Sequence, residues 1–169
     1  MDLSQLCRRK EVSKKVNPQP TPTIATTHPV QDRVLRAFGD ELTVLLNGEQ
    51  TGGAMLLGVI STSPGSGPPP HYHLNEDEWF LVQEGRASFF VGGQWQEVPI
   101  GTRVFVPRTV VHTFKNVGDK PLRMLFGALP AGFEKFYARC SDECAKPNGP
   151  DMERIAQIAS EHGIHFAQP

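Results

Sequence analysis

The fold and the chemistry of this chain are decided by the stretch Gly65-Ser-Gly-Pro-Pro-Pro-His71-Tyr-His73-Leu-Asn-Glu-Asp-Glu78. Two histidines in this stretch, His71 and His73, are separated by a single residue. Side chains two residues apart in a β-strand point to the same face of the sheet. The spacing therefore predicts that both imidazoles face one common space.

Glu78 begins the apolar run Trp79-Phe-Leu-Val82. The period of a strand places Glu78, Phe80 and Val82 on one face. Trp79 and Leu81 then face the opposite side. A carboxylate on the inner face of a narrow barrel needs a partner, because burying an unpaired charge is costly. Two neutral imidazoles and a bound cation provide such a partner.

A further ligand candidate, His112, stands in the stretch Pro107-Arg-Thr-Val-Val-His112-Thr-Phe-Lys-Asn116, after a proline turn and at the start of a predicted strand. Three imidazoles and one carboxylate are typical of a divalent transition metal, and too rich in nitrogen for Ca²⁺ or Mg²⁺. Such a ligand set leaves coordination positions open for water, substrate or O₂. The plainer alternative is that lone histidines are structural or exposed, and that residues 76–78 form a solvated acidic turn.

The region from about residue 31 to residue 130 contains short runs rich in Val, Leu, Phe and Thr that alternate with turn residues. The pair Gly92-Gly93 is typical of a hairpin turn. Many short strands without helical periodicity indicate a sandwich or a barrel. The predicted strands are Val34–Phe38, Glu41–Leu46, Ala54–Ser61, Glu78–Val82, Ala87–Val91, Gln94–Val98, Arg103–Val106, His112–Asn116 and Leu122–Leu129.

The two ends of the chain differ from this β-rich region. Residues 1–30 are predicted to be an extended or flexible tail, because the stretch Asn17–Thr23 is spaced by prolines. Residues 131–169 are predicted to be a helical extension packed on the barrel. It would contain a short helix near Gly132–Ala138 and a better defined one at Pro150–His162.

The composition argues against several classes of protein. A formal net charge of −1 gives no reason to expect a nucleic-acid or anionic-membrane partner. The sequence lacks a long apolar run that could span a membrane and an apolar secretory segment near its start, so we expect a cytoplasmic protein. Cys7, Cys140 and Cys144 are an odd set without a disulfide framework. We interpret them as plain cysteines rather than as half of a zinc site.

Two motifs resemble those of the cupin superfamily. The first is Gly65-x5-His71-x-His73-x4-Glu78-x6-Gly85, and the second is Gly101-x5-Pro107-x-Thr109-x2-His112-x3-Asn116. Thr109 stands where the family usually has glycine, which makes the shape of that turn uncertain from the sequence. A softer similarity, from about Arg36 onward, resembles a bacterial group often labelled quercetin 2,3-dioxygenase-like.

The resemblance implies an all-β fold, a cupin-type antiparallel jelly-roll β-barrel with short C-terminal helices. It also implies that the barrel holds one divalent transition metal per chain, which is Fe, Mn, Ni, Co, Cu or Zn. The ligands carried over position by position are His71, His73, Glu78 and His112.

Similar cupins are commonly dimers. Because Trp79 and Leu81 face away from the predicted metal, the outer face of the sheet is apolar and needs cover. We therefore expect a homodimer through the outer sheet, with a contribution from the segment near Val30–Phe38.

The sequence leaves three functions open. The first is a dioxygenase of a small enolic or phenolic, flavonol-like substrate, in which Glu78 accepts a proton from the substrate. Phe80 and Phe114 would then line an aromatic pocket, although they are at least equally well explained as core residues. The second is a metal-assisted isomerase or lyase, in which the metal polarises a carbonyl group. The third is a non-catalytic module that binds or senses a small ligand. Bound iron would favour the first function, and zinc the second or third.

Overall fold

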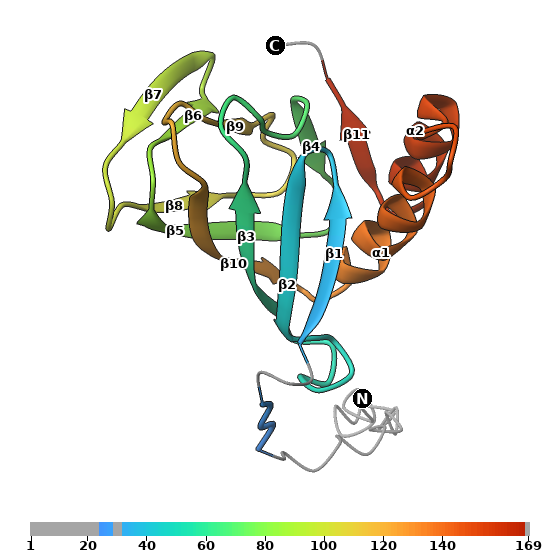
Figure 1. Cartoon of the computed structure of the whole chain (residues 1–169). Helices are drawn as coiled ribbons and strands as arrows, with labels where there is room; N and C mark the ends of the chain where they lie inside the picture. Colours follow the sequence, from blue (N-terminus) through green and yellow to red (C-terminus); the bar gives the residue numbers. More distant parts are fainter. Residues whose placement is uncertain (1–23, 29–31, 168–169) are drawn as a thin grey trace, which may run out of the picture.

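The computed structural model describes residues 24–28 and 32–167 (Figure 1). Most of the predicted tail and Cys7 lie outside these residues. In chain order, the elements are β1 (Arg33–Ala37), β2 (Asp40–Leu46), β3 (Leu56–Thr62), β4 (His71–His73), β5 (Asp77–Glu84), β6 (Ala87–Val91), β7 (Gln94–Val98), β8 (Arg103–Val106), β9 (Thr113–Asn116), β10 (Leu122–Leu129), α1 (Phe133–Cys144), α2 (Met152–Glu161) and β11 (Ile164–Phe166).

The strands form three antiparallel sheets. The largest has the order β1-β2-β3-β10-β5-β8, and the smaller ones have the orders β7-β6-β9 and β11-β4. A bridge between His71 and His112 connects β4 to the start of β9, so the two smaller sheets continue into one another. The predicted antiparallel jelly roll is confirmed, although its hydrogen-bonded sheets do not close into one ring.

The alternation predicted for β5 is present in the structure. Glu78, Phe80 and Val82 are buried, whereas Trp79 and Leu81 are half-buried on the opposite face. The inward-facing aromatic rings of four strands pack against one another, with neighbouring ring centroids 5.2–5.8 Å apart. Burying one such phenylalanine contributes about 1.5–3 kcal/mol. These rings form the core beneath the candidate site, and they are Phe80, Phe89, Phe114 and Phe126.

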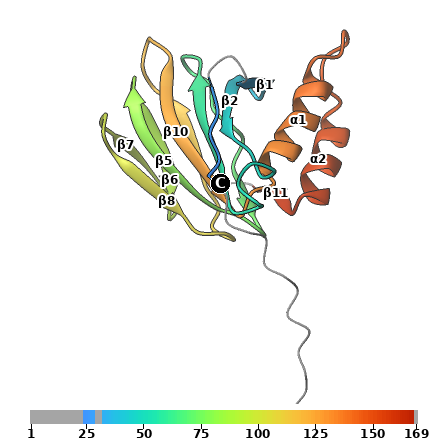
Figure 2. The same cartoon turned by 90° about the horizontal axis from the view of Figure 1, so that it is seen from below.

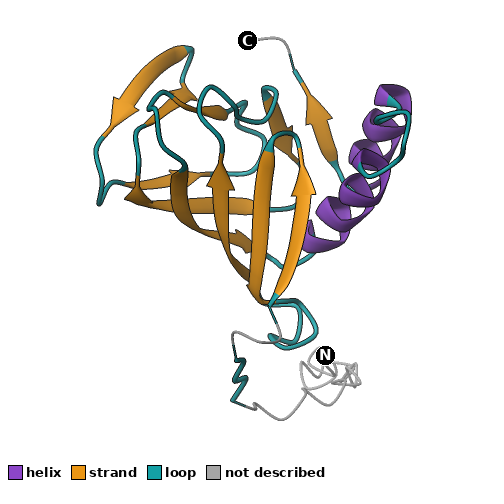
Figure 3. Cartoon of the chain, viewed as in Figure 1, coloured by secondary structure: helices purple, strands orange, loops and turns teal. Residues whose placement is uncertain are grey.

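Among the described residues, both helices lie in the C-terminal part of the chain (Figure 3). They lie side by side next to β1 (Figure 2), and α1 contacts that strand. The first helix, α1, continues beyond the predicted end at Ala138, because its buried stripe includes Cys140 and Glu143. The second helix begins after Asp151, whose side chain accepts hydrogen bonds from the backbone N–H groups of Glu153 and Arg154.

The chain then returns to the barrel, since β11 pairs with β4. The sequence patterns did not predict this strand. The division into a barrel over residues 31–130 and an extension over residues 131–169 stays a prediction. Cys140 and Cys144, the last residue of α1, are free thiols. Within the described residues, the helices are too short or too polar to cross a membrane.

Candidate metal centre

Two histidines of the candidate centre lie at the ends of β4. Both face inward, and Tyr72 between them faces outward, as the spacing predicts. The backbone N–H of His71 donates to the carbonyl of His112 at 3.0 Å, and the N–H of His112 donates back to the carbonyl of His71 at 2.9 Å. The two sequence motifs are therefore joined directly through the backbone of two predicted ligands.

Glu78 reaches the same space from the large sheet, where it is paired with Val106 on one side and Ala128 on the other. Its Oε2 atom lies 2.8 Å from His112 Nε2, and its Oε1 atom lies 3.5 Å from His73 Nε2. The structure brings all four predicted ligands together, with their ligand atoms within 4.8 Å of one another. All four side chains are buried, and they are His71, His73, Glu78 and His112.

The outer nitrogen of each imidazole is already engaged. Nδ1 of His71 lies 2.9 Å from the carbonyl oxygen of Pro69, and Nδ1 of His112 lies 3.0 Å from that of Val110. Nδ1 of His73 lies 3.3 Å from the carboxylate of Glu76. Since these oxygens accept hydrogen bonds, each Nδ1 carries the proton and each Nε2 presents a lone pair to the centre. This arrangement is the one that histidine ligands of metals usually show.

The lone pairs are buried hydrogen-bond acceptors without donors in the described part of the chain, and a bound cation would satisfy them. His73 Nε2 is buried and has no hydrogen-bond partner among the described residues. His112 Nε2 lies 2.8 Å from the Glu78 carboxylate, although the Nδ1 proton of His112 is directed at the carbonyl oxygen of Val110. A divalent ion among three lone pairs and one carboxylate satisfies these groups together. The residues therefore fit a transition metal.

Electrostatics keep Glu78 and His71 in the protonation states that metal binding requires. Burial alone would raise the pKa of Glu78, but the charge of His73 and the contacts with His112 outweigh burial and lower it to about 2. Burial and the neighbouring imidazoles lower the pKa of His71 to about 3. Burial opposes protonation of His73, yet the carboxylates of Glu78 and Glu76 outweigh it and raise the pKa of His73. At neutral pH the centre therefore contains an ionised carboxylate and a neutral His71.

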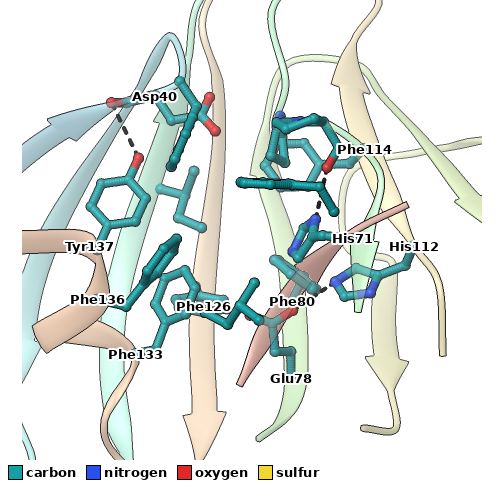
Figure 4. Close-up of a pocket in the computed structure, with 16 residues that line it drawn as sticks. Asp40, His71, Glu78, Phe80, His112, Phe114, Phe126, Phe133, Phe136 and Tyr137 are labelled. Atoms are coloured by element: carbon teal, nitrogen blue, oxygen red, sulfur yellow. Dashed lines mark hydrogen bonds and ion pairs between the residues drawn. The ribbon is translucent and has the colours of Figure 1, made fainter. Parts of the chain in front are cut away.

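A cavity of about 40 Å³ adjoins the centre, and His71, Glu78 and His112 form part of its wall (Figure 4). Phe80 and Phe114 also line it, but their role toward a substrate stays a prediction. The remaining wall is mostly aromatic. Its other aromatic residues are Phe38, Phe126, Phe133, Phe136, Tyr137 and Phe166.

Two polar residues, one beside the centre and one in the wall of its cavity, were not predicted as site residues. Glu76 was considered only as part of a solvated acidic turn, yet it is 6% exposed and contacts His73. That interpretation is wrong for Glu76. It holds better for Asp77, which forms a partly exposed ion pair with Arg108 at 2.8 Å. Asp40 also lines the cavity, and only its position before an alternating strand could have indicated that it faces inward.

The turn that contains Thr109 keeps the shape that a glycine would give. Thr109 has a φ angle of 69°, in the left-handed region that glycine adopts easily. Its backbone N–H donates to the carbonyl of His73 at 2.7 Å, so the turn also fixes the strand that carries two of the histidines. The departure from the motif therefore preserves the local geometry at a cost in backbone strain.

Comparison with known proteins places this barrel in a family. The family described as "Cupin domain" matches residues 58–127, a stretch that contains all four residues of the centre. Residues 58–127 of the chain therefore form a cupin domain. An RmlC-like cupin from Shewanella frigidimarina superposes with a TM-score of 0.56, at 18% identity, over 67% of this chain and 96% of that one. The polyketide cyclase RemF from Streptomyces resistomycificus superposes with a TM-score of 0.54, at 23% identity, over 63% and 80% of the two chains. At these identities, both likenesses show the fold alone.

Among curated proteins, the polyketide synthase CurC from Streptomyces cyaneus is 30% identical to this chain over 96 residues. The match covers 56% of this chain and 62% of CurC. It therefore spans less than two thirds of that relative's own length.

Proposed function

We propose that this cupin is a metal-dependent enzyme that binds one divalent transition metal through His71, His73, Glu78 and His112. The observation that supports this most strongly is the set of three Nε2 lone pairs converging on the Glu78 carboxylate, each on an imidazole oriented through its Nδ1 atom. When bound, the metal would supply Lewis-acid or redox chemistry at an oxygen atom of the substrate.

The substrate that we propose is a small enolic or phenolic molecule. The aromatic wall of the cavity favours a flat apolar body and excludes water, while the buried centre favours an anionic oxygen. A cavity of about 40 Å³ is too small for a three-ring flavonol, and also for a single aromatic ring, unless the lining side chains move. We therefore propose that lining side chains move when the substrate binds.

Glu78 has two possible roles, as a ligand and as a proton acceptor. A general base acts best when its pKa lies near the working pH. The pKa of Glu78 lies far below 7, which suits the ligand role better. The variant Glu78→Gln separates the two roles, since it keeps the three imidazoles but removes the carboxylate.

Two reaction classes remain as proposals. The first is the dioxygenase reaction that the likeness to quercetin 2,3-dioxygenase-like cupins suggests. The second is a redox-neutral isomerase or lyase reaction. The match to a protein named polyketide synthase favours the second, because polyketide chains contain enolisable carbonyl groups. A non-catalytic role in binding a small ligand is the outcome if neither reaction occurs.

The test is to load the metal-free full chain separately with iron, manganese, nickel, cobalt and zinc, and to measure metal content and turnover. Oxygen uptake with catechols, 1,3-diketones and flavonols identifies a dioxygenase, and anaerobic conversion identifies a redox-neutral enzyme. We expect about one metal per chain, sharply reduced in His73→Ala. A matched control is His165→Ala, since His165 lies on β11 and stacks on Tyr72 outside the centre. Wild-type protein that binds none of the five metals would contradict the proposal.

The homodimer also stays a proposal. Trp79 on the outer face of β5 is paired in register with Phe105 of β8, whose side chain is 62% exposed. Val34 on β1, within the segment expected to contribute, is also exposed. An exposed apolar face of this kind supports contact between two copies. The cytoplasmic location stays a prediction as well.

A further inference from the structure

Asp40 lies in the wall of the same cavity, away from the metal centre. It is the first residue of β2 and follows the tight turn Phe38-Gly39. Its exposed fraction is only 7%, so the carboxyl group is almost completely removed from solvent. Figure 4 shows Asp40 and His71 on opposite sides of the cavity. The cavity is therefore polar at two ends.

The carboxyl group of Asp40 is compensated only in part, by the hydroxyl group of its register partner Thr62, which lowers the pKa of Asp40. Its buried Oδ1 atom has no hydrogen-bond partner among the described residues. The nearby Tyr137 hydroxyl donates instead to the backbone carbonyl of Ala37 at 3.0 Å, with a longer contact to the backbone carbonyl of Asp40 at 3.4 Å. A buried acceptor without a donor destabilises the fold. Such a group persists most readily where a bound molecule supplies the donor.

The space between the two ends is apolar. Phe80, Phe114 and Phe126 form the wall around it, and their rings offer no acceptor for a hydroxyl group. Among the described residues that line the cavity, Asp40 and the predicted ligands have the only ionisable polar groups apart from Tyr137, which has a hydroxyl group. Burial also raises the pKa of Asp40 to about 6, and the hydroxyl group of Thr62 offsets this rise only in part.

We propose that Asp40 is a specificity-determining residue that accepts a hydrogen bond from a hydroxyl group at the end of the bound molecule remote from the metal. The inference rests on the proposed function in one respect, namely that the other end of the molecule is an enolic or phenolic oxygen at the metal centre. The substrate class is thereby narrowed to small, flat molecules with two separated hydroxyl groups. Molecules with a carboxylate at the remote end are excluded by charge repulsion.

The test compares probes that differ by one hydroxyl group. Cobalt-loaded full chain is titrated anaerobically with phenol, resorcinol and hydroquinone, and binding is measured by calorimetry. A hydrogen bond to a charged group is worth enough to tighten binding at least tenfold. We expect this gain for at least one dihydroxy probe in the wild type. In Asp40→Ala we expect the gain to disappear, while the affinity for phenol changes by no more than about twofold.

Asp40→Asn serves as a second variant that keeps the size of the side chain and an acceptor atom without the charge. It should retain part of the gain, and it keeps the test available if Asp40→Ala does not fold. The carboxyl ¹³C signal of Asp40 separates a binding role from a structural one. It should shift when the dihydroxy probe binds and should not shift when phenol binds.

Equal affinities of all three probes in the wild type would overturn the inference, as would a gain that survives in Asp40→Ala. Failure of the wild type to bind any probe would overturn it too. Failure of the proposed function is a separate result, because it appears as absence of bound cobalt in elemental analysis. The probe comparison is then repeated with the cobalt-free chain, where loss of the gain in Asp40→Ala would still support Asp40 as the acceptor.

Discussion

The buried carboxyl group of Asp40 predicts a dependence of stability on pH that one substitution can isolate. Asp40→Asn keeps the size of the side chain and removes its ionisation. Its Oδ1 atom has no hydrogen-bond partner among the described residues, and the amide oxygen of the variant can still accept a hydrogen bond from the hydroxyl group of Thr62. The change therefore measures the free energy of keeping this charge in the folded protein.

The magnitude follows from the shift in pKa. Burial raises the pKa of Asp40 from its ordinary value of 3.8 to about 6, and its register partner Thr62 offsets this only in part. A tenfold change in a dissociation constant is worth about 1.4 kcal/mol, so the shift corresponds to about 3 kcal/mol. In the folded state Asp40 holds its proton more tightly than in the unfolded state. Stability is therefore lost as the pH rises from about 3.8 to about 6, and the loss is complete above that range.

The assay is urea unfolding of the metal-free full chain between pH 4 and pH 8, with a chelator present so that release of metal in acid does not contribute. We expect Asp40→Asn and the wild type to be nearly equally stable at pH 4. At pH 8 we expect the variant to be more stable by about 3 kcal/mol. Asp119→Asn, in an exposed turn, controls for the loss of one negative charge. A stability difference that stays constant over this range would refute the reasoning.

The other predictions concern the centre and the surface around it. Glu78→Gln should retain metal but lose most turnover if the carboxylate also moves a proton, as measured by oxygen uptake or anaerobic conversion at matched metal content. Glu76→Gln should weaken metal binding by about 10–100-fold, measured by competition with a chelator, because it loosens the orientation of His73. Thr109→Gly should raise the free energy of unfolding by about 0.5–1 kcal/mol, since it removes left-handed strain at an exposed position. Phe105→Glu should convert the proposed dimer to a monomer in light scattering.

Much of the fold and of the centre could be predicted because the relevant signals are local. His71 and His73 are two residues apart, and Glu78 begins an alternating strand, so the period of a strand fixes which way all three point. The ends of most strands are marked by turn residues, such as Gly92 and Gly93, which both adopt positive φ angles. The assignment of His112 as the fourth ligand rested mainly on the resemblance to a family, because no local pattern relates His112 to the first motif.

The features that the sequence did not predict depend on distant contacts. The three residues of β11 carry too little pattern to be recognised as a strand, and they form one only because β4 offers its edge. The burial of Glu76 follows from the position of His73, and a sequence of three acidic residues in a row points to solvent instead. Asp40 alternates with apolar residues, but the lack of a donor for its Oδ1 atom is a property of the packed structure.

Because of these distant contacts, the geometry of the centre depends on the whole barrel. β4 has only three residues, too few to be stable on its own. It is fixed by β11 along one edge, by the bridge to His112 along the other, and by the Thr109 turn at His73. Glu78 enters from the opposite sheet, between two paired strands. Because the predicted ligands come from strands that only long-range contacts hold together, their geometry is formed only when both walls of the barrel are assembled. A metal that bridges the walls would therefore stabilise the assembled state over the unfolded chain.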